Sequence, residues 1–429
     1  MTRRPSSYET DWLRLDWRLT TLVAAASGRL PTDRMDAAAP TRLPQTVWAL
    51  GLVSLFMDVS SEMIHGLMPL FLTGLGASAL LIGVIDGVGE ATASIVKIFS
   101  GRISDLIGRR KPLLLLGYGL GALSKPVFAL AGAASVVFAA HVADRFGKGV
   151  RGAPRDALVA DVTPKEHRGR AYGLRQALDT AGAFIGPLVA IALMTAFHDD
   201  MRAVFWCAAI PALMCVLTIV FAVRETPSAA LAAPEVASGW PFAVRLGRPF
   251  WSVAALGVVF TLARFSEAFL VLKVHSVGLP LALAPMVLVV MNLVYAAAAY
   301  PSGALSDRQP PGRLLAAGLG ALFVADIILA SARTVHVALL GVAFWGAHLA
   351  LTQGLFAKMI ADAAPEGLRA TAFGAFHFLS GLAVLAASVL AGLLWDRIGP
   401  GATFLAGAGF AVAAAAGLVL NKGGWPAGA

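Results

Sequence analysis

Three of the long apolar segments in this sequence carry acidic and basic residues at helical spacing. On a helix with about 100° per residue, the members of each set fall on one face, within about 60° of one another. The three sets are Asp58, Glu62 and His65; Asp86, Glu90 and Lys97; and Asp144, Lys148, Arg151 and Arg155. A charged side chain in the middle of a bilayer is costly, so it is expected to be paired, to line water or to take part in transport chemistry. We therefore expect these three faces to share one cavity.

Carboxylates in such a cavity are candidates for carrying protons. A carboxylate can load and release a proton when burial and a nearby cation change its proton affinity. The candidate proton-coupling residues are Asp58, Glu62, Asp86, Glu90 and Arg145, the last as a modulating charge together with Lys148. Asp58 and Glu62, both on the first apolar segment, are the first choices.

Other polar residues of the apolar segments are candidates for lining a substrate cavity. They are His65, Lys97, Lys125, Lys148, Arg151, Arg264, Glu267, Asn292 and His348. The second half of the chain is poorer in charge, and Asn292 occupies the position that Glu90 has in the first half. We therefore expect coupling chemistry in the first half and more neutral and aromatic contacts in the second. Arg175 and Asp179 are four residues apart and can pair on one helix. His141 is expected near the outer surface, in water.

Composition excludes an ordinary soluble protein. Hydrophobic residues make up 58% of the 429 positions and charged residues 14%, against about 45–50% and 25% in soluble domains. The two cysteines, Cys207 and Cys215, are held about 12 Å apart if their segment is a helix, so they form no disulfide. No metal-ligand spacing and no nucleophile–base pair stands out, and we expect neither an enzyme nor a bound cofactor or metal.

Twelve apolar stretches are long enough to cross a bilayer as helices. They cover 46–72, 79–100, 112–130, 135–158, 172–197, 203–223, 250–272, 279–302, 314–331, 335–360, 371–394 and 402–420.

The loops between these stretches alternate between rich and poor in Arg and Lys. The rich set includes Arg109, Arg110 and Lys111, whereas the other set has little more than Arg202, Arg333 and Arg397. The positive-inside rule places the rich loops and both termini in the cytoplasm, which explains most of the net charge of +9 without a nucleic-acid partner. The expected organisation is a cytoplasmic tail 1–44, a six-helix bundle 45–224, a cytoplasmic linker 225–248, a second six-helix bundle 249–421 and a tail 422–429.

The two bundles carry an internal repeat of about two hundred residues. SGRISD at 100–105 recurs as SGALSD at 302–307, and GLGAL at 119–123 recurs at 318–322. Asp161, Pro164, Arg168 and Gly173 have the same spacing as Asp362, Pro365, Arg369 and Gly374, and Ser61-Glu62 matches Ser266-Glu267. Two similar bundles that rock around a site at their interface are what an alternating-access carrier needs.

The loop GRISDLIGRRK at 101–111 resembles the loop signature of the major facilitator superfamily, and it lies between the second and third stretches as that signature does. The resemblance implies a conformational latch that includes Gly101, Asp105, Gly108, Arg109 and Arg110. The second copy keeps Gly303 and Asp307 but loses most of the basic residues, so a weaker latch is expected there.

Two further motifs extend the resemblance. Arg145 followed by small residues up to Gly149 is similar to the fourth-helix motif that the family ties to proton coupling. Gly173, Gly182, Gly186 and Pro187 have the spacing of the antiporter signature, although its closing Gly pair is Ala190-Ile191 here. A face of glycines can also serve only close helix packing.

The resemblance implies an all-α polytopic membrane protein with 12 transmembrane helices in two pseudo-symmetric six-helix bundles. The function it implies is proton-coupled export of a small molecule across the inner membrane by a monomer, with the substrate, protons and the lipid bilayer as partners. Uptake or facilitated transport of an anionic or zwitterionic solute is one alternative, and the acidic residues of the first two helices leave a cation open. A non-transporting membrane sensor built on the same fold is another.

Overall fold

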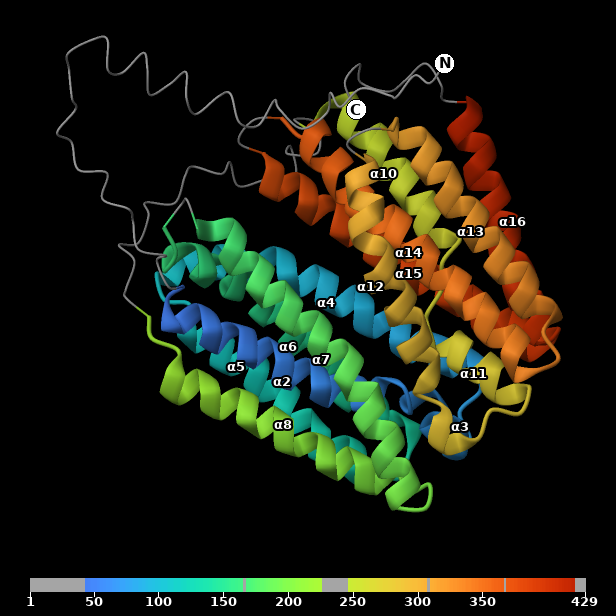
Figure 1. The fold of residues 1–429 in the computed structure, drawn as a ribbon, viewed down its shortest axis with the longest axis horizontal. Coiled ribbons are helices and arrows are strands. Elements are labelled where there is room, and N and C mark those ends of the chain that lie inside the picture. The colour runs from blue at the N-terminus through green and yellow to red at the C-terminus, as the bar shows by residue number, and fades with distance from the viewer. Residues whose placement is uncertain (1–42, 165–166, 226–245, 307–308, 366–367, 421–429) are drawn as a thin grey trace, which may run out of the picture. The chain divides into compact units, whose positions relative to one another are not determined.

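The computed structural model describes residues 43–164, 167–225, 246–306, 309–365 and 368–420, and within these ranges every regular element is a helix (Figure 1). Residues 1–42 of the predicted tail 1–44, most of the predicted linker and residues 421–429 lie outside the described residues. The first half contains α2 (Gln45–His65), α3 (Met68–Gly74), α4 (Ala79–Ile107), α5 (Lys111–Leu130), α6 (Ala134–Asp161), α7 (Arg168–Ala196) and α8 (Met201–Ala222). The second half contains α10 (Gly247–Leu262), α11 (Ala268–Ser276), the short 3₁₀ helix η2 (Leu281–Leu283), α12 (Met286–Ser306), α13 (Pro311–Ser331), α14 (Val335–Ala363), α15 (Arg369–Arg397) and α16 (Pro400–Leu420).

The predicted spans agree with these helices. In the described part of the chain, 10 segments are long and apolar enough to cross a membrane. The other two predicted spans are α6, whose hydropathy is lowered by charged residues such as Asp144, Arg145 and Lys148, and the seventh span, which is divided into α10 and α11. The first span is divided as well, into α2 and α3.

Local signals explain several helix ends. Ser78 Oγ accepts a hydrogen bond from the Leu81 amide at the start of α4, and Asp200 accepts from the Arg202 and Ala203 amides at the start of α8. These side chains satisfy amide groups that have no partner inside the helix. Gly108 ends α4 at a φ of 66°, a left-handed conformation that favours glycine. Gly108 of the predicted latch therefore also fixes where the loop turns.

Helix contacts repeat between the two halves. In the first half α2 packs on α7 and α8, α4 on α6, and α5 on α6 and α8. In the second half α10 packs on α15 and α16, α12 on α14, and α13 on α14 and α16. Each contact of the first half thus has its counterpart in the second, as the sequence repeat predicts.

The most extensive contact between the halves is that of α4 with α15, and its counterpart is that of α12 with α7. Glycines allow α4 and α15 to approach closely. A Cβ atom added to Gly83 would overlap the Ser388 carbonyl oxygen, and one added to Gly392 would lie 2.5 Å from Leu80 Cα. Only glycine fits a helix contact this short without moving the backbone.

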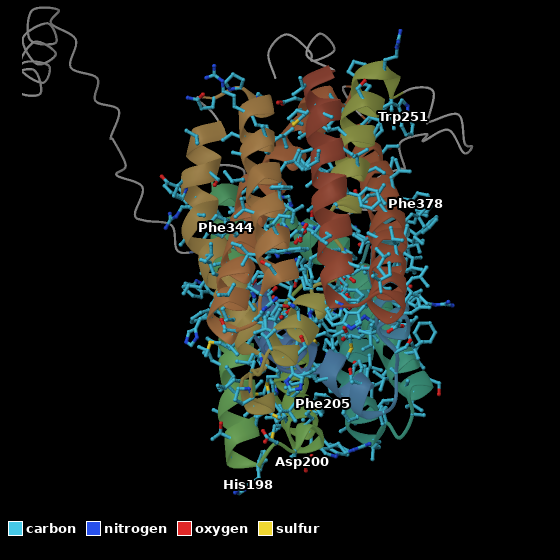
Figure 2. All side chains as sticks on the ribbon, turned by 90° about the vertical axis from the view of Figure 1, so that its right-hand side faces the viewer. His198, Asp200, Phe205, Trp251, Phe344 and Phe378 are labelled. Carbon is cyan, nitrogen blue, oxygen red and sulfur yellow. The ribbon has the colours of Figure 1, made fainter. Side chains whose placement is uncertain are left out.

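One large apolar core joins the halves. It includes Met63, Leu67 and Phe71 of the first half with Phe269 and Leu288 of the second. Its second-half members continue to Phe250 near the start of α10, whereas its first-half members lie at the end of the helices where α3 packs on α11. We call this the α3/α11 end. Figure 2 shows Phe205, Asp200 and His198 toward this end and Trp251 toward the opposite one.

The second apolar core contains residues of the first half alone. Val47 and Leu50 of α2 pack there with Leu114, Leu158 and Ala171, near the end where α2 and α10 begin. We call this the α2/α10 end. Apolar packing of the described residues therefore closes the junction of the halves at the α3/α11 end.

Asp396, near the last residue of α15, adds a polar contact at the α3/α11 end. Its Oδ1 accepts a hydrogen bond from the Ala79 amide at 3.0 Å, and its Oδ2 accepts one from the Leu80 amide at 2.9 Å. Ala79 and Leu80 are the first residues of α4, where amide groups lack helical partners and the helix dipole favours an anion.

Replacing Asp396 with alanine should weaken the α3/α11 end by about 1–2 kcal/mol, since helix caps contribute about this much. That free energy corresponds to a shift of roughly 5- to 30-fold in the closed-to-open ratio. Pulsed electron paramagnetic resonance between spin labels at Asp199 and Arg333, in a Cys207→Ala, Cys215→Ala background, would measure the shift. Asp396→Asn keeps an acceptor and should lie between wild type and Asp396→Ala. Equal distance distributions in all three proteins would contradict this role.

Candidate functional site

Polar side chains from both halves meet next to the apolar core of the α3/α11 end, and we call this group the junction cluster. Its members are Glu62 and His65 on α2, Asp86 and Glu90 on α4, His141, Arg145 and Lys148 on α6, and Arg264, Ser266 and Glu267 between α10 and α11.

Ion pairs connect the first-half members of the junction cluster. Arg145 Nη1 lies 3.0 Å from Glu90 Oε1, and His141 Nε2 lies 3.4 Å from Asp86 Oδ1. His65 Nδ1 lies 3.9 Å from Glu62 Oε1. The Asp86, His141 and Arg145 side chains are buried, whereas the Glu90 side chain is 37% exposed. The cluster is therefore less enclosed by protein on the side of Glu90 than on the side of Asp86.

Ser266 joins the two halves through a hydrogen bond. Its Oγ donates to Asp86 Oδ2 at 2.5 Å and also accepts from the Ala268 amide at 3.0 Å. The Ser266 amide in turn donates to Ser388 Oγ on α15 at 3.1 Å. Asp86 thus contacts a histidine of its own half and a serine of the other half.

The break in the seventh span brings Arg264 and Glu267 to the cluster. Residues 263–267 lie between the end of α10 and the start of α11, so their side chains do not follow the helical spacing of the flanking residues. The charges of His65, Glu62 and Asp86 act on Glu267, and those of Glu267 and Glu90 act on Arg264. Broken helices of this kind line substrate sites in several transporter folds.

Lys125, Asp144 and Arg151 form a different group, inside the first half between α5 and α6. Lys125 Nζ lies 2.9 Å from Asp144 Oδ1, and the two side chains are 2% and 8% exposed. Lys125 also donates to Ser61 Oγ at 3.1 Å. The Arg151 guanidinium lies over the Tyr118 ring, 4.7 Å from its centroid. Lys125 and Arg151, both predicted to line the cavity, are therefore engaged with neighbouring helices of their own half.

Asp58 belongs to a third group, nearer the α2/α10 end. It lies beside Asp179 of α7. Arg155 Nη1 lies 3.5 Å from Asp179 Oδ1 and donates to Ser54 Oγ at 3.0 Å. Arg175 Nη1 is 3.8 Å from Asp179 Oδ1, which is the local pair expected from their spacing. The predicted face of α2 is thus divided, with Asp58 in this group and Glu62 and His65 in the junction cluster.

Three predicted cavity residues lie apart from these groups. Lys97 is exposed, and its side chain passes Gly152 of α6. Asn292 is half-buried on α12. His348 is buried between α13 and α14, where its Nδ1 lies 2.8 Å from the Gly318 carbonyl oxygen.

The predicted latch residues have packing and capping contacts. Arg110 Nη1 donates to Ser104 Oγ at 2.6 Å, and Glu225 accepts from the backbone amides of Arg110 and Lys111 at the start of α5. Lys111 Nζ donates to the Val220 and Val223 carbonyl oxygens at the end of α8. Arg109 is exposed, and Gly101 faces Ala153 of α6. The side chain of Asp105 lies outside the described part of the chain.

The glycines of the antiporter-like motif bring α7 close to α2. A Cβ atom at Gly182 would lie 2.7 Å from the Leu55 carbonyl oxygen, and one at Gly186 would lie 2.8 Å from that of Val59. Pro187 lies inside α7. Close packing accounts for both glycines.

His141 corrects one sequence-based expectation. It was expected in water near the outer surface, but its ring is buried between α6 and α4, beside Asp86. The spacing of His141, Arg145 and Lys148 is that of one helix face, and this signal identifies His141 as a neighbour of the coupling candidates. Ser266 was indicated only by the repeated Ser-Glu pair, and its contact with Asp86 depends on the break in the seventh span.

Comparisons with known proteins identify the family. The family model described as Major Facilitator Superfamily matches residues 50–388. The chain belongs to this superfamily. It is 30% identical over 387 residues to an uncharacterized MFS-type transporter of Methanocaldococcus jannaschii, covering 86% of this chain and 93% of that protein. It is also 32% identical over 139 residues to Multidrug resistance protein MdtH of Edwardsiella ictaluri, which covers 32% of this chain and 34% of the relative.

A solved structure shows the same fold. The crystal structure of a variant of the nucleoside transporter NupG matches with a TM-score of 0.74 at 12% identity, over 88% of this chain and 100% of that chain. The protein is therefore a multi-pass membrane protein of a transporter family and not an enzyme. Among the side chains that the structure describes, no three His, Cys, Asp or Glu residues are grouped to hold a metal ion.

Proposed function

We propose that this transporter exports a small charged molecule in exchange for protons, by rocking of its two halves around the junction cluster. The halves correspond to residues 45–224 and 249–421, joined by a cytoplasmic linker at 225–248, and the working unit is a monomer. The observation that carries the proposal is the position of the junction cluster. It consists of titratable groups of the first half in direct contact, through Asp86 and Ser266, with the broken span of the second.

Proton coupling is supported by the pairing of carboxylates with histidines. Glu62 lies beside His65, and Asp86 lies beside His141, with Arg145 next to Glu90. A histidine and a carboxylate can exchange or share a proton, and a nearby arginine favours the charged carboxylate. Movement of one half changes the contacts of Asp86 with Ser266, and this couples the proton affinity of the cluster to the transport cycle.

The mixture of charges favours a zwitterionic solute. Arg145, Lys148 and Arg264 supply cations, whereas Glu62, Glu90 and Glu267 supply anions in the same cluster. A solute with both charges can pair with both sets without leaving one of them buried and unpaired.

The orientation follows from the loop charges. The basic loops lie at the α2/α10 end, which we place in the cytoplasm of a bacterial inner membrane together with both termini. The apolar core at the α3/α11 end then closes the outer side, and the structure represents an inward-facing state. The partial similarity to a multidrug resistance protein supports export over uptake.

Proton flux in everted membrane vesicles tests the proposal. Vesicles that contain the overproduced protein are energised to a fixed pH gradient and challenged with a panel of anionic, zwitterionic and cationic solutes. A zwitterionic solute should partly collapse the gradient. The double variant Asp58→Asn, Glu62→Gln should lose this collapse to the level of vesicles without the protein, because both candidate carriers become neutral and untitratable.

The matched control is Asp200→Asn, since an amide oxygen still caps α8 and the residue lies far from the junction cluster. The two single variants separate the Asp58 group from the junction cluster. Intact collapse in the double variant would contradict the assignment of Asp58 and Glu62. Flux of a labelled solute without any collapse would identify a facilitator, and ligand-induced thermal stabilisation without flux would identify a sensor.

A further inference from the structure

Asp326 on α13 is a buried carboxyl group that the junction cluster does not include. It is 0% exposed, and neither of its oxygens has a hydrogen-bond partner among the described residues. By contrast, Glu90 and Asp144 each have a cationic group within 3.0 Å. An ionised carboxylate without a partner is strongly disfavoured in an apolar interior. Asp326 therefore holds a proton in this state.

The carboxyl group lies beside the break in the seventh span. A Cβ atom added to Gly407 of α16 would lie 2.6 Å from Asp326 Oδ2 and 3.1 Å from Phe265 Cε1, so the carboxyl and the Phe265 ring meet over this glycine. Phe265 stands between Arg264 and Ser266, and it also contacts the Trp345 and Phe404 rings at centroid distances of 5.2 and 5.4 Å. A movement at Asp326 is therefore passed to the segment that contacts Asp86.

A small, mostly apolar cavity lies next to this contact. This cavity of about 10 Å³ is lined by Phe265, Gly407, Leu262 and Thr403. This volume is close to the smallest that admits one water molecule. A small displacement of α16 or of the Phe265 ring would bring water to the carboxyl group.

We propose that Asp326 is a second proton-binding site, located in the C-terminal half, that is protonated while the α3/α11 end is closed and releases its proton when that end opens. The step moves one proton from the carboxyl group to water and leaves a carboxylate that the water solvates. This inference deepens the proposed proton coupling and rests on it, because it adds a carrier that acts on the second half.

Few titratable groups surround Asp326. Helix α16 contributes none, and the residues of α13 include only Arg313 besides Asp326. Helix α14 contributes His348, which is bound to the Gly318 carbonyl oxygen, two turns of α13 away from Asp326. The broken span contributes Arg264 and Glu267, whose charges act on the junction cluster. The proton on Asp326 therefore responds chiefly to its own burial.

Infrared spectroscopy of the purified protein in lipid nanodiscs tests the protonation. The wild-type protein at neutral pH should show a carbonyl stretching band of a protonated carboxylic acid that Asp326→Asn lacks. Asp200→Asn is the control, because Asp200 is an exposed carboxylate that accepts from two amides at the start of α8, and its replacement should leave the band unchanged. A band that is the same in wild type and Asp326→Asn would overturn the proposal.

Electron paramagnetic resonance tests the link to opening. The Asp199–Arg333 distance distribution is recorded across a pH series for wild type, Asp326→Asn and Asp326→Leu in the cysteine-free background. One proton released on opening changes the open-to-closed ratio by up to about tenfold per pH unit. Both variants should lose this part of the response and stay closed at high pH.

The same pH response in both variants as in wild type would overturn the link. Asp326→Leu guards against misfolding of the asparagine variant, because it replaces the carboxyl group with an apolar side chain of similar size. Neither measurement requires a transported solute. Failure of the proton-flux experiment on Asp58 and Glu62 is therefore distinguishable from failure of this inference.

Discussion

Replacing Lys125 with methionine should lower the free energy of unfolding by about 3–5 kcal/mol, which is the cost of removing one partner from a buried ion pair. Methionine keeps most of the volume of the lysine side chain but leaves the Asp144 carboxylate, 8% exposed, without its cation at 2.9 Å. Asp144 would retain a hydrogen bond from the Ser124 hydroxyl at 3.4 Å and the more distant charges of Arg145 and Arg151. Unfolding by SDS titration in mixed micelles measures the loss.

The double variant Lys125→Met, Asp144→Leu should recover most of this stability, because the Asp144 carboxylate is removed together with its cation. The recovery distinguishes a structural ion pair from a pair that binds the solute. A stable single variant that fails to transport would place Lys125 in the substrate pathway instead. An equal decrease in the free energy of unfolding for Lys125→Met and for the double variant would mean that packing, and not charge, determines the effect.

Adding a methyl group at Gly392 should shift the conformational equilibrium away from the state closed at the α3/α11 end. The new Cβ would lie 2.5 Å from Leu80 Cα and 2.6 Å from the Ala79 carbonyl oxygen, and these backbone atoms cannot move without separating α4 from α15. Overpacking of this kind costs about 1–3 kcal/mol. The closed-to-open ratio should fall by roughly 5- to 150-fold.

The Asp199–Arg333 distance measurement reports this shift as a larger population of long distances. Gly409→Ala is the matched control, because a Cβ at Gly409 of α16 would meet nothing within 4 Å. Both substitutions replace glycine with alanine within a helix, so they share the change in helix propensity. The same distance distribution in the two variants would show that the closed state accommodates the methyl group at Gly392, because α4 and α15 move apart there without cost.

Helix length and hydropathy predicted the spans well, because a bilayer requires about 20 apolar residues in a helix that satisfies its own backbone. The stretch 135–158 was predicted with the others and forms α6, although its charged residues keep it outside the 10 segments that length and apolar composition select. The break between α10 and α11 was not predicted, and 250–272 was expected as one helix. It depends on tertiary contacts such as the bond of the Ser266 amide to Ser388, which is 122 residues away.

Packing between helices also decides which of the candidate residues lie together, and the sequence predicted this grouping only in part. Helical spacing places Asp58, Glu62 and His65 on one face of α2, but it does not say which helix packs against each turn of that face. Asp58 meets Asp179 of α7, whereas Glu62 and His65 lie at the junction of the halves. Asp144 likewise shares a polar stripe with Lys148, yet it turns to Lys125 of α5. Neighbour identity is set by packing and cannot be read from one helix alone.

The two halves meet along two seams, the contact of α4 with α15 and the contact of α12 with α7, which are counterparts in the repeat. They correspond to the two symmetry-related contacts of a homodimer interface. In a homodimer the two seams would have to be identical. Gene duplication removed that constraint: α4 carries Asp86 and Glu90, whereas α12 contains no charged residue and has Asn292 at the corresponding position. The seam of α4 with α15 can therefore specialise in binding ions. The seam of α12 with α7 can open and close without breaking ion pairs of α12. Two unequal copies in one chain can therefore carry different residues at equivalent positions, which the two subunits of a homodimer cannot.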